Sequence, residues 1–422
     1  MADQVPGKAW VVVFAGTAVN LCLGILYAWS VWSKALIDES KALAGVVQEG
    51  LNAGWPYLTN SEAATPFSIC VIIFTLLMIP GGKIQDKFGP KVGAITGGLF
   101  LAVGCIIAGL AKSYTGLIIG FGVFGGIGMG IGYAAPTPAA LKWFGPHKRG
   151  LIAGLVVGGY GGAALYVAWL GNKLIASGGI SYSFIWLGIF FAVVTIIAGS
   201  LLAWPEPGYV PPAQVGAVSV AAKAATTIDW APSEILKTGQ FFGLVLMFIA
   251  STQSGLMIIS IAAPLGTKML GAAAWMLASF GGLINALGRV GTGLYSDKIG
   301  RSNAYALNCI VSAICLFLMP LIMQAGSIFL LFLAVGIAYW QYGGGLSLMP
   351  SFTADFFGPK NLGMNYGLVF LGWGGGFFMA KVAGIIKDMT GTYNMAFYLS
   401  AIVLIIGVII SRINKRPMHV TE

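Results

Sequence analysis

Charged side chains are scarce in this chain. Asp, Glu, Lys and Arg make up 9% of its 422 residues, whereas 58% are hydrophobic and the mean hydropathy is +0.88. Soluble domains carry ~25% charged residues. The long apolar stretches contain no Asp, Glu or His. An enzyme working at membrane depth needs a nucleophile and a base, or a metal cluster, so this absence argues against an intramembrane enzyme. The composition predicts a polytopic membrane protein.

Cysteine and histidine are also few, and their positions exclude several kinds of site. The two histidines, His147 and His419, lie in a loop and in the tail, so no histidine proton relay is expected inside the membrane. The cysteines lie within apolar stretches at no metal-ligand spacing, which predicts small buried side chains without a disulfide, metal or cofactor. They are Cys22, Cys70, Cys105, Cys309 and Cys315.

Apolar runs of about 20 residues, the length that crosses a hydrocarbon core of about 30 Å, recur along the chain. The first is too long, and lacks the flanks, for a cleaved signal peptide, so it is read as a span. We place twelve spans near residues 9–33, 63–82, 92–111, 114–141, 150–171, 183–204, 241–266, 272–296, 302–323, 327–354, 363–386 and 393–411.

The basic residues predict the orientation of these spans. An even number of spans puts both termini on one side, where fifteen Lys and Arg residues fall against six on the other side. Basic loops stay in the cytoplasm, so both termini are expected there, in a multi-pass protein of the plasma (inner) membrane. The same rule accounts for the net charge of +10. No nucleic-acid partner is needed to explain it.

Two loop motifs occur twice at nearly the same offset. Gly82–Lys91 matches Gly293–Arg301 at a distance of 211 residues, and Trp143–Lys148 resembles Phe356–Lys360 at a distance of 213. This repetition predicts a duplicated six-span unit. We therefore expect an N-terminal bundle over residues 1–204, a cytoplasmic linker over 205–240 and a C-terminal bundle over 241–422.

The first repeated loop carries charge at helix ends. Asp86 and Asp297 each close a span, with basic residues entering the next span: Lys87 and Lys91 in the first copy, Lys298 and Arg301 in the second. A single Asp-Lys loop is usually a solvated turn. Its recurrence at equivalent places predicts a conformational latch, in which each carboxylate holds neighbouring helix ends through charge-assisted hydrogen bonds.

These loops, Gly82-x-x-x-Asp86-Lys87-x-Gly89-x-Lys91 and its second copy, resemble the signature of the major facilitator superfamily. Pro90 and Ser302 stand where that pattern has basic residues. The resemblance covers the whole chain. It implies an all-α integral membrane fold of twelve transmembrane helices in two pseudo-symmetric six-helix bundles, working as a monomer. Substrate would bind near the midplane and be released by alternating access.

One charge lies inside an apolar span. Arg289 sits in the middle of residues 272–296, and an embedded charge costs roughly 2.5–3.5 kcal/mol. Its central position prevents the side chain from reaching water. We therefore expect Arg289 to receive an anion, and a guanidinium matches a carboxylate bidentately. Asn285, one turn earlier on the same face, can steady the guanidinium or bind a substrate oxygen.

Tyrosines are candidates for the remainder of the cavity. If spans one, four, seven and ten line it, as the resemblance implies, Tyr27, Tyr133, Tyr339 and Tyr342 can offer phenolic donors. The alternative for each is an aromatic residue at the membrane interface.

Within the superfamily the chain looks similar to oxalate/formate antiporters, to animal proton-linked monocarboxylate transporters and to bacterial lactate-type carriers. The matches are Leu26-Tyr27-Ala-Trp29, Tyr133 ahead of Ala139-Ala140, Gly159-Tyr160-Gly161, Asn285-x-x-x-Arg289 and Asn365-Tyr366-Gly367.

This resemblance adds Leu26 and Tyr160 to the expected site and implies proton symport of a small monocarboxylate of the L-lactate or pyruvate class. Trp373 stands where the oxalate exchangers have a lysine, which favours a monoanion over a dianion. Asn285 stands where the animal carriers have an aspartate and cannot titrate, so the route of the proton stays open. Exchange of organic anions is the alternative function.

Overall fold

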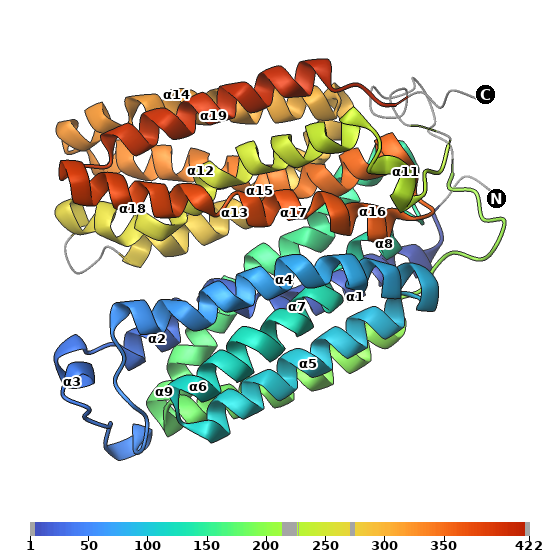
Figure 1. Cartoon of the computed structure of the whole chain (residues 1–422). Helices are drawn as coiled ribbons and strands as arrows, with labels where there is room; N and C mark the ends of the chain where they lie inside the picture. The colour runs from blue at the N-terminus through green and yellow to red at the C-terminus, as the bar shows by residue number, and fades with distance from the viewer. Residues whose placement is uncertain (1–4, 213–225, 227, 271–274, 418–422) are drawn as a thin grey trace.

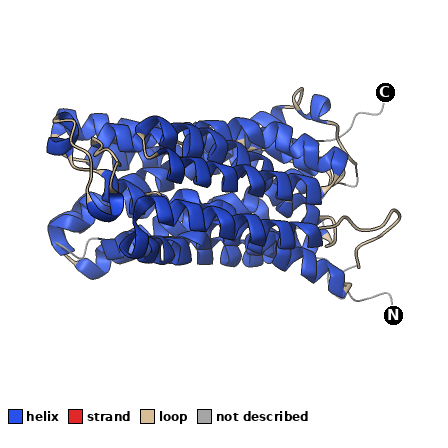
Figure 2. Ribbon diagram, turned by 90° about the horizontal axis from the view of Figure 1, so that it is seen from below, coloured by secondary structure: helices blue, strands red, loops and turns tan. Residues whose placement is uncertain are grey.

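The computed structural model describes residues 5–212, 226, 228–270 and 275–417, and the regular structure in these ranges is helical (Figure 2). The only strand-like pairings there are two isolated bridges, Ile37 with Leu58 and Val47 with Pro56. The all-α prediction is confirmed. Residues 213–225 and 227 of the predicted linker lie outside the described residues.

The helices form two groups that lie side by side, coloured blue to green and yellow to red in Figure 1, and both termini lie at the same end. We call this the terminal end, and the other the opposite end. The first group comprises α1 (Gly7–Leu23), η1 (Gly24–Ala28), α2 (Ser30–Leu36), α3 (Glu39–Leu43), η2 (Gly50–Asn52), α4 (Asn60–Phe88), α5 (Pro90–Ala111), α6 (Tyr114–Leu117), η3 (Ile118–Gly125), α7 (Gly126–Tyr133), α8 (Pro136–Leu141), η4 (Pro146–Lys148) and α9 (Arg149–Leu201).

The second group begins within the predicted linker, where α11 lies and α12 starts. It comprises α11 (Pro232–Ile235), α12 (Gly239–Leu270), α13 (Trp275–Ile299), α14 (Arg301–Ala325), α15 (Ile328–Phe357), α16 (Leu362–Val369), α17 (Leu371–Gly375), α18 (Phe378–Thr390) and α19 (Asn394–Ile413). Below, "first half" and "second half" denote these two groups.

The helices supply twelve membrane crossings. Among the described residues, ten helical segments are long and apolar enough to span a membrane. One of them, 146–201, contains two crossings because α9 turns sharply at Gly179 (φ +85°). The twelfth crossing is α13. A Cβ at Gly179 would lie 2.2 Å from the carbonyl oxygen of Leu51, so both the backbone and the packing require glycine here.

Several helices run further than the hydropathy pattern predicts. The helical segment of span five continues through Gly178 instead of ending near residue 171. At the terminal end α15 extends past residue 354 and includes Asp355, which is 1% exposed. Similarly, Asp86 lies within α4 and Asp297 within α13. The span predicted to end near residue 354 therefore leaves out an acid that the helix contains, whereas Asp86 and Asp297 lie near the ends of their helices. Hydropathy cannot place an acid whose charge is balanced by tertiary partners.

Residues 34–62 form an insert between the first two spans at the opposite end, and this insert is helical only in short pieces. Gly45 and Gly50 adopt positive φ (+67° and +63°), which interrupts the helical conformation there. The insert packs on the first half beside the Gly179 turn. There the Ile180 N–H donates to Asn52 Oδ1 (2.9 Å) and Trp55 Nε1 donates to Ser181 Oγ (3.0 Å).

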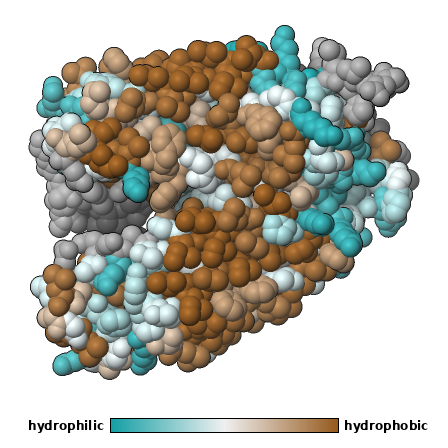
Figure 3. Space-filling view, viewed as in Figure 1, coloured by the Kyte–Doolittle hydropathy of each residue, from teal (hydrophilic) through white to brown (hydrophobic). Residues whose placement is uncertain are grey.

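An apolar belt covers the face shown in Figure 3, with most of the polar residues gathered toward the two ends. Ile, Leu, Phe and Val side chains along the helices are exposed there, as expected for surfaces that contact lipid. The molecule is a multi-pass membrane protein.

Candidate functional site

Arg289 lies fully buried in the middle of α13, between the two halves. Its Nε donates to Asn285 Oδ1 (3.1 Å), its Nη1 to the carbonyl oxygen of Val157 (2.8 Å) and its Nη2 to Tyr27 Oη (3.4 Å). All three acceptors are neutral. No carboxylate forms an ion pair with this guanidinium in the part of the chain that the structure describes. The positive charge is therefore held by hydrogen bonds without being neutralised.

A glycine of α9 makes room for this guanidinium. A Cβ at Gly161 would lie 2.8 Å from Arg289 Nε and 3.0 Å from Cζ, so any larger residue would displace the side chain. About two helical turns earlier in α9, a Cβ at Gly154 would lie 2.4 Å from the carbonyl oxygen of Arg289. Small residues thus bring α9 of the first half against α13 of the second, as close helix packing in membranes requires.

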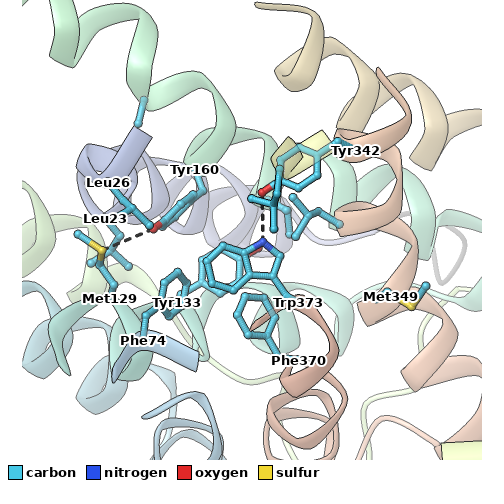
Figure 4. Packing of buried hydrophobic residues seen from close by; sticks show 14 of the residues in the cluster. Leu23, Leu26, Phe74, Met129, Tyr133, Tyr160, Tyr342, Met349, Phe370 and Trp373 are labelled. Atoms are coloured by element: carbon cyan, nitrogen blue, oxygen red, sulfur yellow. Dashed lines mark hydrogen bonds between the residues drawn. The ribbon is translucent and has the colours of Figure 1, made fainter. Parts of the chain in front are cut away.

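A chain of hydrogen bonds runs from Arg289 to Tyr27 of the first half and from there to Tyr342 and Trp373 of the second half. Tyr27 Oη lies 2.9 Å from Tyr342 Oη, and Trp373 Nε1 donates to Tyr342 Oη (3.1 Å; Figure 4). Tyr27 Oη accepts a hydrogen bond from Arg289, and Tyr342 Oη accepts one from Trp373. One of the two phenolic hydrogens forms the hydrogen bond between the two hydroxyls. The other phenolic hydrogen has no acceptor among the described contacts. The chain therefore has a surplus donor, which suits an incoming acceptor such as a carboxylate.

Aromatic rings pack around this chain. Phe74 of α4 lies 5.5 Å from Tyr133 and 5.8 Å from Tyr160 in the first half, and 5.3 Å from both Phe370 and Trp373 in the second (ring centroids). Tyr133 and Tyr160 meet edge to face at 5.0 Å. These rings of the two halves pack against one another (Figure 4).

The structure brings most of the predicted binding residues together. Arg289, Asn285, Tyr27, Tyr342 and Trp373 form the hydrogen-bonded chain; Tyr133 and Tyr160 belong to the ring cluster, and Figure 4 places Leu26 beside Tyr160.

Tyr339 lies apart from this group. Its ring packs on Gly281, about two helical turns along α13 from Arg289.

Two carboxylates at the terminal end bind helix N-termini across the halves. Asp86 accepts from the backbone N–H groups of Gly363 (3.2 Å) and Met364 (2.8 Å), where α16 begins. Asp297 accepts from those of Gly150 and Leu151 (both 2.9 Å), where α9 begins. The free N–H groups and the dipole of a helix start favour an anion. The partners of both carboxylates are therefore backbone amides of the opposite half. The basic residues of the same loops differ in whether they contact these carboxylates.

Arg301 is the one loop cation that joins these contacts. It forms an ion pair with Asp297, and its Nε donates to Asp355 Oδ2 (3.0 Å); Arg149 Nη1 of the first half donates to Asp355 Oδ1 (2.8 Å). In contrast, Lys87, Lys91 and Lys298 are exposed.

The charged contacts around Asp86 are fewer than those in this cluster. Pro90 occupies the position equivalent to Arg301, and Lys142 approaches Asp86 only to 4.0 Å.

Comparison with known proteins agrees with this architecture. The sequence profile of the Major Facilitator Superfamily matches residues 9–380. The chain belongs to the major facilitator superfamily. It is 27% identical to the oxalate:formate antiporter of Oxalobacter formigenes over 94% of this chain and 89% of the relative. It is 24% identical to monocarboxylate transporter 12 of Xenopus laevis over 81% and 80%. The fold matches the superfamily transporter FucP in the outward conformation (TM-score 0.66, 16% identity, 96% and 100% covered).

In this major facilitator superfamily transporter, the aromatic ring cluster and the ion pairs at the terminal end also contain residues that were not predicted from the sequence. Phe74 and Phe370 are ordinary apolar residues within spans, and no local pattern distinguishes them from lipid-facing ones. Arg149 and Asp355 could have been found, because both lie within or beside the second repeated loop. Their pairing needed the tertiary structure.

Proposed function

We propose that this transporter carries a small monocarboxylate of the L-lactate or pyruvate class across the plasma membrane together with a proton, with both termini in the cytoplasm. The observation that carries the proposal is the uncompensated charge of Arg289, buried between the halves with neutral acceptors only. Such a site gains most from an anion, because binding supplies the missing negative charge in surroundings of low dielectric.

The donors beside Arg289 suit one carboxylate. A carboxylate that accepts from Nη2 of Arg289 can take the surplus phenolic hydrogen of Tyr27 or Tyr342 with its second oxygen. Trp373, at the position of a second cation in the exchangers, offers only a neutral N–H to Tyr342. One positive charge balances one carboxylate, which favours a monoanion.

Proton coupling is proposed from the similarity to the proton-linked carriers, and the charge of Arg289 bears on how the loaded and empty carriers move. A bound monoanion neutralises Arg289, whereas the empty carrier must move with this charge exposed to a changing environment. Asn285 beside the guanidinium cannot titrate, so the proton accompanies the substrate as its carboxylic acid or enters with the arginine–anion pair. Net uptake then acidifies the receiving side. Exchange of two organic anions, the alternative, avoids the empty state.

Proteoliposome transport tests the proposal and separates it from exchange. A panel of small carboxylates competing with labelled L-lactate at two external pH values should show competition by monocarboxylates and faster uptake at the lower pH. External alkalinisation should accompany net uptake without internal substrate. Competition by dicarboxylates alone would refute the substrate class, and uptake that strictly needs internal counter-substrate would establish exchange.

The latch contacts fit the same cycle. Asp86 and Asp297 hold α16 and α9 across the terminal end, so the conformation described here is closed on the proposed cytoplasmic side. Alternating access requires these contacts to separate when the halves rock.

Installing a second cation should change the substrate charge. We expect Trp373→Lys to strengthen competition by oxalate at least tenfold and to weaken competition by lactate, because an ammonium near Tyr342 balances a second carboxylate and repels Arg289 when only one is bound. Competition curves measure both effects. Trp373→Phe, which removes the N–H without adding charge, is the control and should not gain oxalate affinity.

Adding one methyl group beside the guanidinium should weaken binding. In Gly161→Ala the new Cβ would overlap Arg289 Nε, so the side chain must move, and a displacement of about 1 Å can cost up to ~100-fold in activity. We expect uptake at low substrate to fall at least tenfold. Gly162→Ala is the matched control, because its Cβ would meet only Leu21 Cδ2, at 3.9 Å. Equal uptake by the two variants would contradict the arrangement.

A further inference from the structure

A second cavity opens at the terminal end, away from Arg289, and has a volume of about 740 Å³. Small-molecule sites typically measure about 300–1,000 Å³. Its walls come from the loop between α8 and α9, from the start of the linker, and from Pro359 and Lys360 of the second half. None of the residues that bind around Arg289 lines it.

Cations outnumber acids in the walls. Lys142, Arg149 and Lys360 face one carboxylate, that of Asp229, which accepts from the Lys360 backbone N–H (2.9 Å). The Nη1 of Arg149 is engaged by Asp355, but its Nε–H has no acceptor in the described part of the chain. Burial lowers the pKa of Lys142, and the carboxylates of Asp86, 4.0 Å from the ammonium, and Asp229 oppose this shift only in part. An anionic ligand would therefore be favoured here.

Flat rings form another part of the wall. Trp204 and Tyr209 line the cavity, and the ammonium of Lys142 lies 4.6 Å from the centre of the Trp204 ring. Tyr209 is fixed in place because its hydroxyl donates to the carbonyl oxygen of Trp143 (3.0 Å). The indole N–H of Trp204 lacks an acceptor among the described residues. A planar ring can stack favourably on such a side chain.

We propose that this cavity binds a ligand of the nucleotide class, with phosphates on the basic groups and a planar base on the aromatic wall, and that the bound ligand holds the terminal end closed. The second part rests on the proposed alternating access and cytoplasmic orientation. Because the walls belong to both halves, rocking would take the cavity apart. A ligand that binds only the assembled cavity shifts the population toward this conformation.

Binding is tested without transport. The purified chain in phosphatidylcholine nanodiscs is titrated with labelled ADP, and adenosine and pyrophosphate are used as competitors. We expect saturable binding, with each competitor at least tenfold weaker than ADP. Lys360→Gln and Trp204→Leu should each raise the Kd at least fivefold. Lys237→Gln, a change at another exposed lysine of the terminal end, should leave the Kd unchanged.

Transport then tests the effect on the cycle. ADP trapped inside proteoliposomes should lower the maximal rate of lactate uptake several-fold without raising its KM, and external ADP should have no effect. Absence of saturable ADP binding, equal competition by pyrophosphate, or a Kd unchanged in both cavity variants would overturn the proposal. Failure of lactate uptake in the unmodified protein would instead refute the proposed function and leave the binding result intact.

Discussion

Arg289→Gln is expected to abolish monocarboxylate uptake, with a fall of more than about 100-fold. The substitution removes the only charge in the predicted site. A bound carboxylate would lose the hydrogen bond from Nη2 together with its buried counter-charge, and removing one partner of a buried ion pair costs about 3–5 kcal/mol. Tenfold corresponds to about 1.4 kcal/mol, so the loss exceeds two orders of magnitude. Initial rates of labelled lactate or pyruvate uptake in proteoliposomes measure it.

The fold should survive this change, because glutamine is neutral and replaces a buried guanidinium that has no carboxylate partner among the described residues. The melting temperature and the elution profile in detergent should therefore match the unmodified protein. Arg289→Lys separates charge from shape: an ammonium keeps the charge but loses the planar fork, so we expect uptake with a strongly raised KM. Near-normal uptake by Arg289→Gln would remove the arginine from the site.

Most of the fold could be predicted from sequence because membrane crossing imposes a simple rule. Every backbone polar group must be satisfied within the bilayer, so long apolar runs become helices. The break in α9 was harder to predict from the sequence. Its helical segments meet at a single residue, Gly179, whose geometry depends on the insert packed against it rather than on a polar loop. Hydropathy predicts a longer interruption, over residues 172–182, which the structure does not have.

The candidate site divides in the same way. Arg289 was recognisable from its cost, since an embedded charge stands out against an apolar background, and Asn285 followed from helical spacing. Tyr27 and Tyr342 meet across the two halves, and only the three-dimensional arrangement shows the surplus hydrogen that their pairing leaves. Tyr339 shares a helix face with Tyr342 in sequence, yet one turn of α15 is enough to pack it on Gly281.

Unequal latches are a consequence of sequence asymmetry between the repeats. Pro90 and Lys142 in the first half correspond to Arg301 and Asp355 in the second. The first half thus holds α16 with one carboxylate, whereas the second adds a buried cluster of two arginines and two aspartates. We infer that separation at the terminal end is resisted mainly by the Asp297–Arg301–Asp355–Arg149 cluster.

Asp355→Asn should accordingly shift the conformational equilibrium toward opening at the terminal end by about tenfold to a hundredfold. The carboxylate joins Arg149 of the first half to Arg301 of the second, and its side chain is 2% exposed. Removing one partner of a buried ion pair costs about 3–5 kcal/mol. Arg301 and Asp355 belong to the same half, so their contact is present in both conformations. Only the contact between Asp355 and Arg149 is lost when the halves separate, and this contact contributes about 1.5–3 kcal/mol to the closed conformation.

Spin labels at Lys148 and Lys237, one in each half at the terminal end, would report the shift as a longer distance population. Asp86→Asn should lengthen it less, because its amide oxygen can still accept from one of the two α16 N–H groups, and the cation that pairs with Asp86 among the described residues, Lys142, lies 4.0 Å away. Glu49→Gln, a change at an exposed acid of the insert at the opposite end, should leave the distribution unchanged. The ranking Asp355→Asn above Asp86→Asn is the decisive result: equal or reversed effects would mean that the helix-start contacts, and not the buried ion cluster, hold the two halves together.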